Sequence, residues 1–287
     1  MTTERTRLRD DAVALASEAG QVLRRHFGRV TRVRAKESWA SVVSEADLEA
    51  EACILEALRA RHPRDGILAE ESGHQPGESD RTWVVDPLDG TSNFVAGLPW
   101  FGVMVAVLEG SVPLAGAIHL PLDGITYAGA RGGGVTRNEQ PVQVTAETDL
   151  RRLLLGYSFD PALDEAGANA QALTLARLAR SVRNVRSTNS MLDFVFTIDG
   201  RFGGCLNHAT RIWDIAAPIL LFEEAGGLLT GLDGVPIRLD LGPEAAQRNY
   251  SVLGAGRELH RQLVALLQSL PAASSGTPSG NGLAGAS

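Results

Sequence analysis

Cysteine is nearly absent from this chain of 287 residues, which contains only Cys53 and Cys205. Each thiol lies in an apolar stretch, where free cysteine packs as a small hydrophobic side chain, so no disulfide framework is predicted. The chain also lacks any apolar run of about 18 residues, the length that a membrane-spanning helix needs. Residues 1–9 carry charges of both signs and lead into no apolar signal segment. We therefore expect a cytoplasmic protein that is not inserted in a membrane.

An excess of positive charge is missing as well. The chain has 27 Lys and Arg against 34 Asp and Glu, which gives a net charge of -7. Nucleic acids and anionic membranes attract basic surfaces, so neither is expected as a partner. Hydrophobic residues make up 44% of the chain and charged residues 21%, as in soluble globular proteins. A chain of this length and composition is expected to fold around a core large enough for an enzymatic cleft.

Helical and strand patterns alternate along the sequence. Helices are expected over roughly the first 25 residues, from Ser44 to just before Pro63, and over 164–180, 190–199, 215–225 and 257–269. Short apolar runs predict strands at 66–69, 82–85, 101–108, 112–120, 125–130, 153–157, 202–206 and 251–254. Gly and Pro between the runs from 101 to 130 predict antiparallel pairing there. The pattern predicts an α/β fold of layered helices and sheets.

The composition changes at Pro271 to Pro, Ala, Ser, Gly, Thr and Asn. Such a segment has too little apolar surface to bury, so residues 271–287 are predicted to be a disordered tail. Residues 1–270 are then the folded part. We expect an N-terminal α+β half of about residues 1–145 and a C-terminal α/β half of about residues 146–270.

The strongest local signal is the run DPLDGTSNF, which begins at Asp86. A buried strand delivers Asp86 to its end, Pro87 is expected to stop the strand, and Asp89 follows at the turn, so both carboxylates can face one point. Hard divalent cations need such oxygen ligands. Gly90 and Thr91 then begin a helical turn whose free N–H groups suit a phosphate oxygen. The alternative is a polar turn without a chemical role, because Asp, Pro and Gly are common turn residues.

Other acids at element borders have ordinary explanations when each is taken alone. Glu70 and Glu71 follow a short strand and would be exposed strand-end acids. Asp47 stands three residues after Ser44, as in a helix capping box, and Asp214 is placed to be a helix N-cap. The acids that border apolar elements are Glu70, Asp86, Asp89 and Asp214. A protein that buries several carboxylates needs cations to offset their repulsion, so the group together indicates a metal site.

These residues resemble the inositol monophosphatase family, within the superfamily of lithium-sensitive, magnesium-dependent phosphatases. Three blocks carry the resemblance: GILAEES at 66–72, WVVDPLDGTSNF at 83–94, and WDIAA at 213–217 running on to EAGG at 224–227. The blocks occur in the family's order, and the resemblance covers roughly residues 8–270. It implies a layered αβαβα sandwich of the inositol monophosphatase and fructose-1,6-bisphosphatase type, commonly a homodimer. It also implies a Mg²⁺-dependent phosphomonoesterase that acts on a small phosphate ester.

The resemblance implies a set of metal ligands. Glu70, Asp86 and the backbone carbonyl of Leu88 are expected to bind one Mg²⁺. Asp86, Asp89 and Asp214 are expected to bind a second, so that Asp86 bridges the two ions. Glu70 also reaches a third ion in this scheme, and two or three Mg²⁺ are therefore expected per active site.

The resemblance also assigns the groups around the reacting phosphate. Thr91, oriented by Asp47, is expected to position the attacking water together with Glu70, without a nucleophilic Ser or Cys. The backbone amides of Gly90 and Thr91 are expected to hold the phosphate. Glu71 is expected to orient ligands from outside the coordination shell, and Lys36 matches a basic residue on a loop near the site.

The substrate side departs from the family pattern. Inositol-specific relatives carry an acid six residues before the Trp-Asp pair, where this chain has Asn207. The stretch before Leu192-Asp193 lacks the usual Gly-Ser followed by small residues. Asn189 or Ser190 there either contacts substrate or caps the next helix. We expect Asn189 and Asn207 to bind substrate.

Three kinds of function are compatible with these residues. The first is a phosphatase of inositol monophosphate or a related sugar or polyol phosphate. The second is a phosphatase of histidinol phosphate, a fructose bisphosphate or a 3'-phosphonucleotide, although nucleotidase relatives more often have Lys-Glu where this chain has Ser92-Asn93. The third is a regulatory protein that binds partners through the phosphatase fold, and the acidic net charge argues against RNA as that partner.

Overall fold

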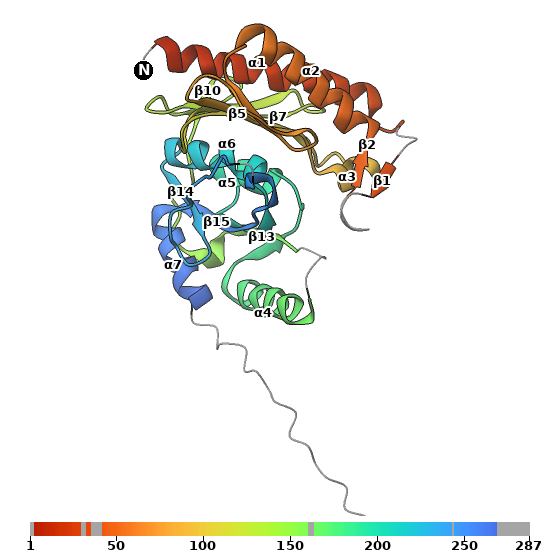
Figure 1. Cartoon of the computed structure of the whole chain (residues 1–287). Helices are drawn as coiled ribbons and strands as arrows, with labels where there is room; N and C mark the ends of the chain where they lie inside the picture. Colours follow the sequence, from red (N-terminus) through yellow and green to blue (C-terminus); the bar gives the residue numbers. More distant parts are fainter. Residues whose placement is uncertain (1–2, 30–32, 36–41, 160–163, 243, 269–287) are drawn as a thin grey trace, which may run out of the picture.

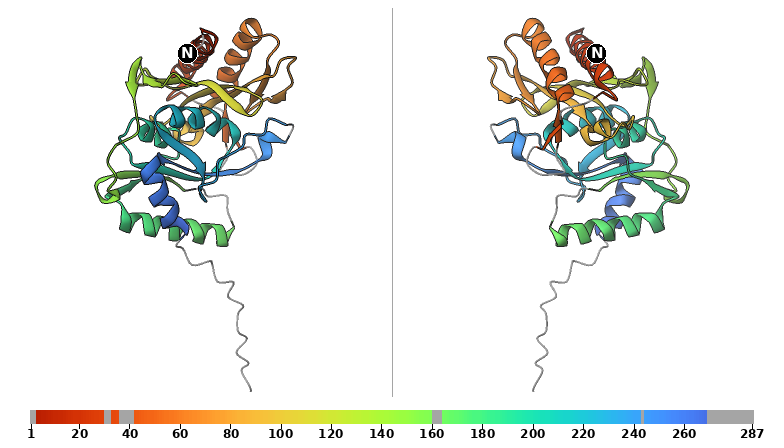
Figure 2. Two further views of the ribbon diagram at one scale, coloured as in Figure 1. Left: turned by 90° about the vertical axis from the view of Figure 1, so that its left-hand side faces the viewer. Right: turned by 90° about the vertical axis from the view of Figure 1, so that its right-hand side faces the viewer.

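The computed structural model describes residues 3–29, 33–35, 42–159, 164–242 and 244–268, and these ranges form stacked layers of helices and sheets (Figures 1 and 2). Helices α1 (Thr3–His26) and α2 (Glu45–Arg61) form the outer layer at the top of Figure 1. The helical spacing of Leu8, Ala12 and Leu15 places these side chains in the core beneath α1. The predicted tail, 271–287, lies outside the described residues.

The larger sheet lies beneath α1 and α2. Its strands are β3 (Gly66–Ala69), β4 (Gly73–Gln75), β5 (Arg81–Asp89), β6 (Gly102–Glu109), β7 (Val112–Leu120), β8 (Ile125–Ala130), β9 (Val135–Arg137) and β10 (Gln140–Val142). They are ordered β10-β9-β8-β7-β6-β5-β3-β4. The β3–β5 pair is parallel, and β5 to β8 pair antiparallel, as the Gly and Pro punctuation predicted. Helices cover both faces of the central strands, which explains their continuous apolar runs.

The next layers complete the stack. Helices α5 (Leu192–Ile198) and α6 (Ile212–Glu224) pack between the larger sheet and a smaller one. The smaller sheet is ordered β12 (Asn184–Arg186), β11 (Leu154–Ser158), β13 (Gly204–Thr210), β15 (Tyr250–Gly256) and β14 (Gly227–Gly231). Helices α4 (Glu165–Ser181) and α7 (Arg257–Gln268) cover its outer face (Figure 1). The predicted layered αβαβα arrangement is confirmed.

Short elements complete the described chain. They are β1 (Val33–Ala35), β2 (Val42–Ser44), α3 (Thr91–Val95) and the 3-10 turns at Leu150–Arg152 and Ala245–Gln247. In the part of the chain that the structure describes, no helix combines the length and the apolarity needed to cross a bilayer.

Two sequence-based predictions about element ends were wrong. Strand β5 does not stop at Pro87 but continues to Asp89, because its pairing with β6 shifts register between Asp86 and Asp89 and thereby accommodates a residue without an N–H. Helix α6 begins at Ile212, so Asp214 is not its N-cap. Asp214 instead lies inside the first turn, and its carboxylate accepts a hydrogen bond from the N–H of Arg211, the N-cap residue.

Candidate active site

Three carboxylates from two distant parts of the chain converge between the layers. Asp86 and Asp89 lie at the C-terminal end of β5, and Asp214 lies in the first turn of α6. Each offers an oxygen, and these oxygens all lie within 4.8 Å of one another. Among the described residues, this is the one such group of three or more His, Cys, Asp or Glu side chains. The structure therefore brings together the second metal-ligand set that the family resemblance implied.

A backbone N–H fixes each of these carboxylates. Asp86 Oδ1 accepts from the N–H of Leu88 at 3.0 Å, Asp89 Oδ1 from that of Met191 at 2.7 Å, and Asp214 Oδ2 from that of Arg211 at 2.6 Å. In each case this hydrogen bond anchors one oxygen of the carboxylate. Such anchoring restricts the side-chain rotamers, so the site is organised before a ligand arrives.

The carboxylates of this site repel one another strongly. Burial, reinforced by the charges of Glu70, Asp89 and Asp214, raises the pKa of Asp86 well above its usual range. Burial also raises the pKa of Asp89 to about 7, against the N–H of Met191, which lowers it. Burial and the charge of Asp89 raise the pKa of Asp214 to about 7. The carboxyl groups of Glu70 and Asp214 thus lie close enough to Asp86 to influence its pKa.

This donor set fits a hard divalent cation. Clustered carboxylate oxygens are the preferred ligands of Mg²⁺ and Ca²⁺, whereas softer metals favour imidazole or thiolate. A bound cation would offset the repulsion that raises the three pKa values. The chemistry of the acids present therefore supports a metal-binding centre at this point.

The beginning of α3 adjoins the acids. Gly90 has φ +84°, and a Cβ there would lie 2.5 Å from the carbonyl oxygen of Trp100, so only glycine fits. The Thr91 hydroxyl lies 3.0 Å from both Asp47 Oδ1 and the Leu88 carbonyl oxygen. Its single hydrogen serves one acceptor at a time. The predicted association of Thr91 with Asp47 is thus present in the structure.

Asp47 makes hydrogen bonds in two directions. Its Oδ2 accepts the N–H of Ser44 at 2.8 Å, which is one half of the capping box of α2, and it also accepts the Ser44 hydroxyl at 2.6 Å. Its Oδ1 faces Thr91. The helix cap therefore holds the carboxylate in place for the contact with Thr91.

Glu51 was not found from the sequence. It lies one turn after Asp47 on α2, is 4% exposed, and accepts the N–H of Glu71 at 2.8 Å. The N–H of Glu70 donates to the carbonyl oxygen of Val85 on β5. The turn that carries Glu70 is thus held by β5 on one side and by Glu51 on the other. The helical spacing of four residues from Asp47 was the available signal, but an acid on a helix is usually exposed.

Glu51→Ala is expected to lower kcat/KM about 10- to 100-fold, the usual range for a partner that orients a ligand. The physical reason is that the N–H of Glu71 loses its acceptor, so the turn carrying Glu70 is no longer fixed. Steady-state kinetics of the purified variant checks this. Glu51→Gln retains an acceptor oxygen and serves as the matched control, with most of the activity kept. Wild-type kinetics in Glu51→Ala would refute the role.

A cavity of about 170 Å³ opens beside the acids. Its lining residues are Asp89, Asn189, Ser190, Phe194, Asn207, Ala209, Thr210 and Asp214. The side-chain oxygen of Asn207 accepts the N–H of Ala209, which leaves its NH₂ group as a donor. Asn189 does not cap α5, whose N-cap is Met191; its side-chain amide is hydrogen-bonded to the backbone of Phe159. Lys36 lies outside the described residues.

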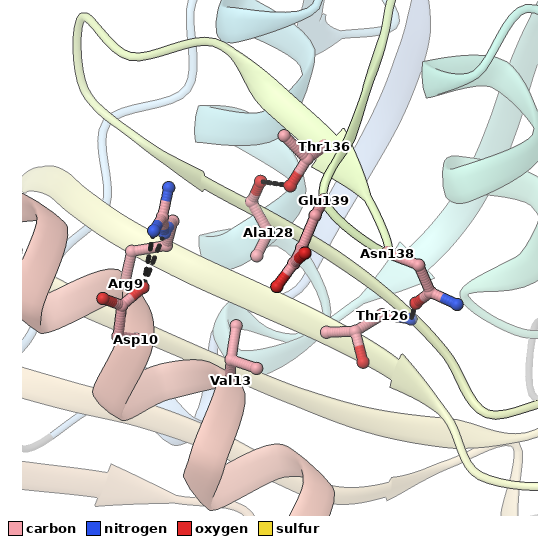
Figure 3. Close-up of a pocket in the computed structure, with 8 residues that line it drawn as sticks. All are labelled: Arg9, Asp10, Val13, Thr126, Ala128, Thr136, Asn138 and Glu139. Carbon is pink, nitrogen blue, oxygen red and sulfur yellow. Dashed lines mark hydrogen bonds and ion pairs between the residues drawn. The ribbon is translucent and has the colours of Figure 1, made fainter.

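A larger cavity, of about 650 Å³, lies elsewhere. Arg9, Asp10 and Val13 of α1 form one side, and residues of β8, β9 and the turn after β9 form the other (Figure 3). The Arg9 guanidinium is hydrogen-bonded to Asp10. Size alone therefore does not locate the site, and the convergence of the carboxylates does.

Known proteins match this chain over nearly its whole length. The model of the inositol monophosphatase family covers residues 4–272. An inositol-1-monophosphatase of Mesorhizobium japonicum is 35% identical over 245 residues, which are 84% of this chain and 92% of the relative. A Nus factor SuhB of Xylella fastidiosa is 34% identical over 239 residues, 82% of this chain and 86% of the relative.

Solved structures agree with the fold. The extragenic suppressor protein suhB of Bartonella henselae superposes with a TM-score of 0.82 at 29% identity, covering 91% of this chain and 98% of the other. Inositol monophosphatase from Anabaena superposes with a TM-score of 0.78 at 30% identity, covering 94% and 98%. With the carboxylates of its sequence blocks also gathered at one point, this chain belongs to the inositol monophosphatase family and is a phosphatase of that type.

Proposed function

We propose that this phosphatase hydrolyses a small phosphomonoester with Mg²⁺ as its cofactor and water as the nucleophile. The observation that carries the proposal is the convergence of Asp86, Asp89 and Asp214 within 4.8 Å, next to the Thr91–Asp47 pair. The inositol-1-monophosphatases among the relatives support the substrate class. Inositol monophosphate or a related sugar or polyol phosphate is the proposed substrate.

Five residues would hold Mg²⁺ in this proposal. Glu70, Asp86 and the Leu88 carbonyl serve one position, and Asp86, Asp89 and Asp214 serve another. When bound there, Mg²⁺ supplies Lewis-acid chemistry: it lowers the pKa of a water molecule and neutralises charge on the phosphoryl and leaving oxygens. Two or three ions per site are proposed on the family's pattern.

The remaining residues are proposed to bind the phosphate and to orient the attacking water. When the Thr91 hydroxyl donates to Asp47, its lone pairs can accept a hydrogen bond from the attacking water, which orients that water toward phosphorus. The backbone N–H groups of Gly90 and Thr91 are proposed to bind the phosphate, since the first turn of α3 leaves them without helical partners. No covalent intermediate is required, and positioning with charge stabilisation carries the catalysis.

The substrate's leaving group is proposed to contact Asn207. Because the side-chain oxygen of Asn207 is occupied by the N–H of Ala209, the residue presents N–H donors to the cavity. Donors of this kind bind an acceptor oxygen on the leaving group. An acid at the same position would instead accept from sugar hydroxyls. Asn189, the second proposed contact, also lines the cavity. Its side-chain amide is already hydrogen-bonded to the backbone of Phe159.

Asn207→Asp is expected to raise kcat/KM for inositol 1-phosphate about tenfold relative to p-nitrophenyl phosphate. The reason is that a hydrogen bond between a hydroxyl and a charged acceptor contributes about 1.5 kcal/mol or more, and about 1.4 kcal/mol corresponds to tenfold. The ratio of the two kcat/KM values in wild type and variant is the measurement. The second substrate is the internal control because its leaving group carries no hydroxyls. An unchanged ratio would place Asn207 outside the substrate contact.

Phosphate release from a panel of monophosphates tests the proposed function. The panel contains inositol, histidinol, sugar and nucleotide phosphates, each with Mg²⁺ and with EDTA. Preferred turnover of a polyol or sugar phosphate supports the proposal, and preferred turnover of histidinol phosphate or a 3'-phosphonucleotide would replace the substrate by the alternative.

A regulatory role is the second candidate, favoured by the relatives named Nus factor SuhB. The net charge of -7 argues against direct RNA binding by the chain alone and leaves a protein partner. No turnover of the whole panel by folded protein that binds Mg²⁺ in calorimetry would favour this candidate. The homodimer is proposed on the family's pattern, and the cytoplasmic location and the division at about residue 145 are proposed on the sequence.

A further inference from the structure

The loop of residues 187–191 joins β12 to α5 and touches the acidic cluster. The N–H of Met191 donates to Asp89 Oδ1 at 2.7 Å, across 102 positions of sequence. The side-chain amide of Asn93 donates to the carbonyl oxygen of Thr188 at 2.9 Å. The loop therefore determines where one of the three carboxylates points, although it belongs to the other half of the chain.

A buried carboxylate holds this loop. Asp193, in the first turn of α5, is 3% exposed and accepts two hydroxyl hydrogens. Its Oδ1 accepts from Thr188 Oγ1 at 3.0 Å, and its Oδ2 accepts from Ser158 Oγ at 3.2 Å. Ser158 ends β11, so Asp193 ties the loop to the C-terminal end of a strand in the smaller sheet. Thr197 Oγ1 donates to the backbone carbonyl of Asp193 and not to its side chain. Among the described interactions, no cationic side chain contacts the carboxylate of Asp193.

The smaller sheet leaves room for this carboxylate. Gly156 on β11 faces Asp193, and a Cβ at Gly156 would lie 2.9 Å from both Cβ and Cγ of Asp193. Real Cβ contacts at that distance are essentially absent, so a side chain at Gly156 would displace Asp193. A buried charge is costly unless it is hydrogen-bonded. The sequence thus places a glycine, two hydroxyls and a carboxylate at one point to hold one short loop.

A second anchor limits movement of the same loop. Asn189 has φ +47°, an uncommon conformation for a residue with a side chain. Its NH₂ group donates to the carbonyl oxygen of Phe159 at 2.9 Å, and its side-chain oxygen accepts from Ser187 Oγ at 2.8 Å. Because Phe159 follows Ser158, both anchors attach the loop to the end of β11. The loop is thus held at Thr188 and at Asn189.

We propose that Asp193 is a positioning residue that, through Thr188 and Ser158, holds loop 187–191 so that the N–H of Met191 orients Asp89. This inference rests on the proposed role of Asp89 as a metal ligand. Asp193 acts through the loop and contacts neither the substrate nor the reacting atoms. The C-terminal half of the chain thereby sets the geometry of a carboxylate that belongs to the N-terminal half.

Calorimetric Mg²⁺ binding and steady-state kinetics of three variants test the proposal. Asp193→Ala removes both acceptors, Asp193→Asn keeps one, and Thr188→Val removes one donor with little change of shape. Asp193→Ala is expected to weaken Mg²⁺ binding and lower kcat about 10- to 100-fold. KM is expected to change less than kcat, because Asn207 lies outside the loop and Asn189 keeps its own hydrogen bond to Phe159. Asp193→Asn and Thr188→Val are expected to lie between Asp193→Ala and wild type.

Asp65→Ala is the matched control. The side chain of Asp65 is 9% exposed and accepts two hydrogens, from Ser79 Oγ at 2.6 Å and Trp83 Nε1 at 3.0 Å, and it lies 3.7 Å from His62 Nδ1. It precedes β3, at the end of that strand opposite Glu70. We expect Asp65→Ala to lower the melting temperature without changing Mg²⁺ affinity or kcat.

Two results would overturn the positioning role. One is wild-type Mg²⁺ affinity and kcat in Asp193→Asn and Thr188→Val, which are the variants most certain to fold. The other is an equal loss of affinity in Asp65→Ala. Failure of the proposed function has a different signature, because a wild-type protein without turnover still gives a Mg²⁺ affinity against which the variants are compared.

Discussion

Asp89→Asn is expected to lower kcat at least about a thousandfold, because a bound cation contributes several kcal/mol to catalysis and each 1.4 kcal/mol corresponds to about tenfold. Asparagine has nearly the shape of aspartate, and its side-chain oxygen still accepts the N–H of Met191. The variant therefore removes charge from the cluster while the fold is kept. Phosphate release under saturating Mg²⁺ measures the loss of kcat. Calorimetric Mg²⁺ binding on the same samples measures the loss of Mg²⁺ affinity.

Glu78→Gln is the control for this prediction. Its side chain is 79% exposed, so the change removes one negative charge without altering a buried group. The control is expected to retain wild-type kinetics and Mg²⁺ affinity. Activity of Asp89→Asn within tenfold of wild type would show that Asp89 is not a ligand needed for catalysis.

The second large effect concerns stability without metal. The pKa of Asp89 rises from 3.8 to about 7 on folding, so between these pH values the folded state holds a proton that the unfolded state has released. The stabilisation is complete below pH 3.8 and is lost as pH rises through 7. A carboxyl group with this change of pKa lowers the free energy of unfolding by roughly 4 kcal/mol at pH 8, at about 1.36 kcal/mol for each pH unit between the two pKa values. Burial raises the pKa of Asp214 in the same direction.

Comparing wild type with Asp89→Asn isolates the contribution of Asp89 to the pH dependence of stability. Burial lowers the pKa of His119, His208 and His260, which makes the protein lose stability toward acid and so acts in the opposite direction. These histidines are common to wild type and variant. In EDTA, the free energy of unfolding of Asp89→Asn minus that of wild type is therefore expected to increase from pH 5 to pH 8.

Urea unfolding in EDTA across this pH range gives the difference directly. Mg²⁺ at 100 times its dissociation constant is expected to restore about 2.7 kcal/mol to wild type. The restoration is expected to be much smaller for Asp89→Asn. A difference that does not change with pH would contradict the raised pKa values. A Mg²⁺ effect equal in both proteins would place the ion elsewhere.

Elements with a strong hydrophobic period were predictable from the sequence. The spacing of Leu8, Ala12 and Leu15 predicts α1, and the apolar runs predict β6 and β7, because burial on one or both faces leaves a local pattern. Element ends were less predictable. Pro87 indicates a strand end when only local rules apply, and the pairing of β5 with β6 overrides it.

The candidate site was predictable only as far as its motifs extend. Asp86, Asp89 and Asp214 lie in blocks with a family pattern, and the structure brings them together. Glu51 and Asp193 lie in no such block, and their importance depends on contacts that no local pattern records. The Met191–Asp89 hydrogen bond spans 102 positions, so the role of Asp193 emerges only once both halves are folded.

The Mg²⁺ dependence of phosphate release by wild-type protein tests the central claim most directly. Protein stripped with EDTA is titrated with Mg²⁺, and the release rate from the best substrate of the panel is compared with calorimetric occupancy. The account predicts no release in EDTA and a rate that rises with occupancy of the carboxylate site. Undiminished release in EDTA, or full occupancy without any release, would contradict it.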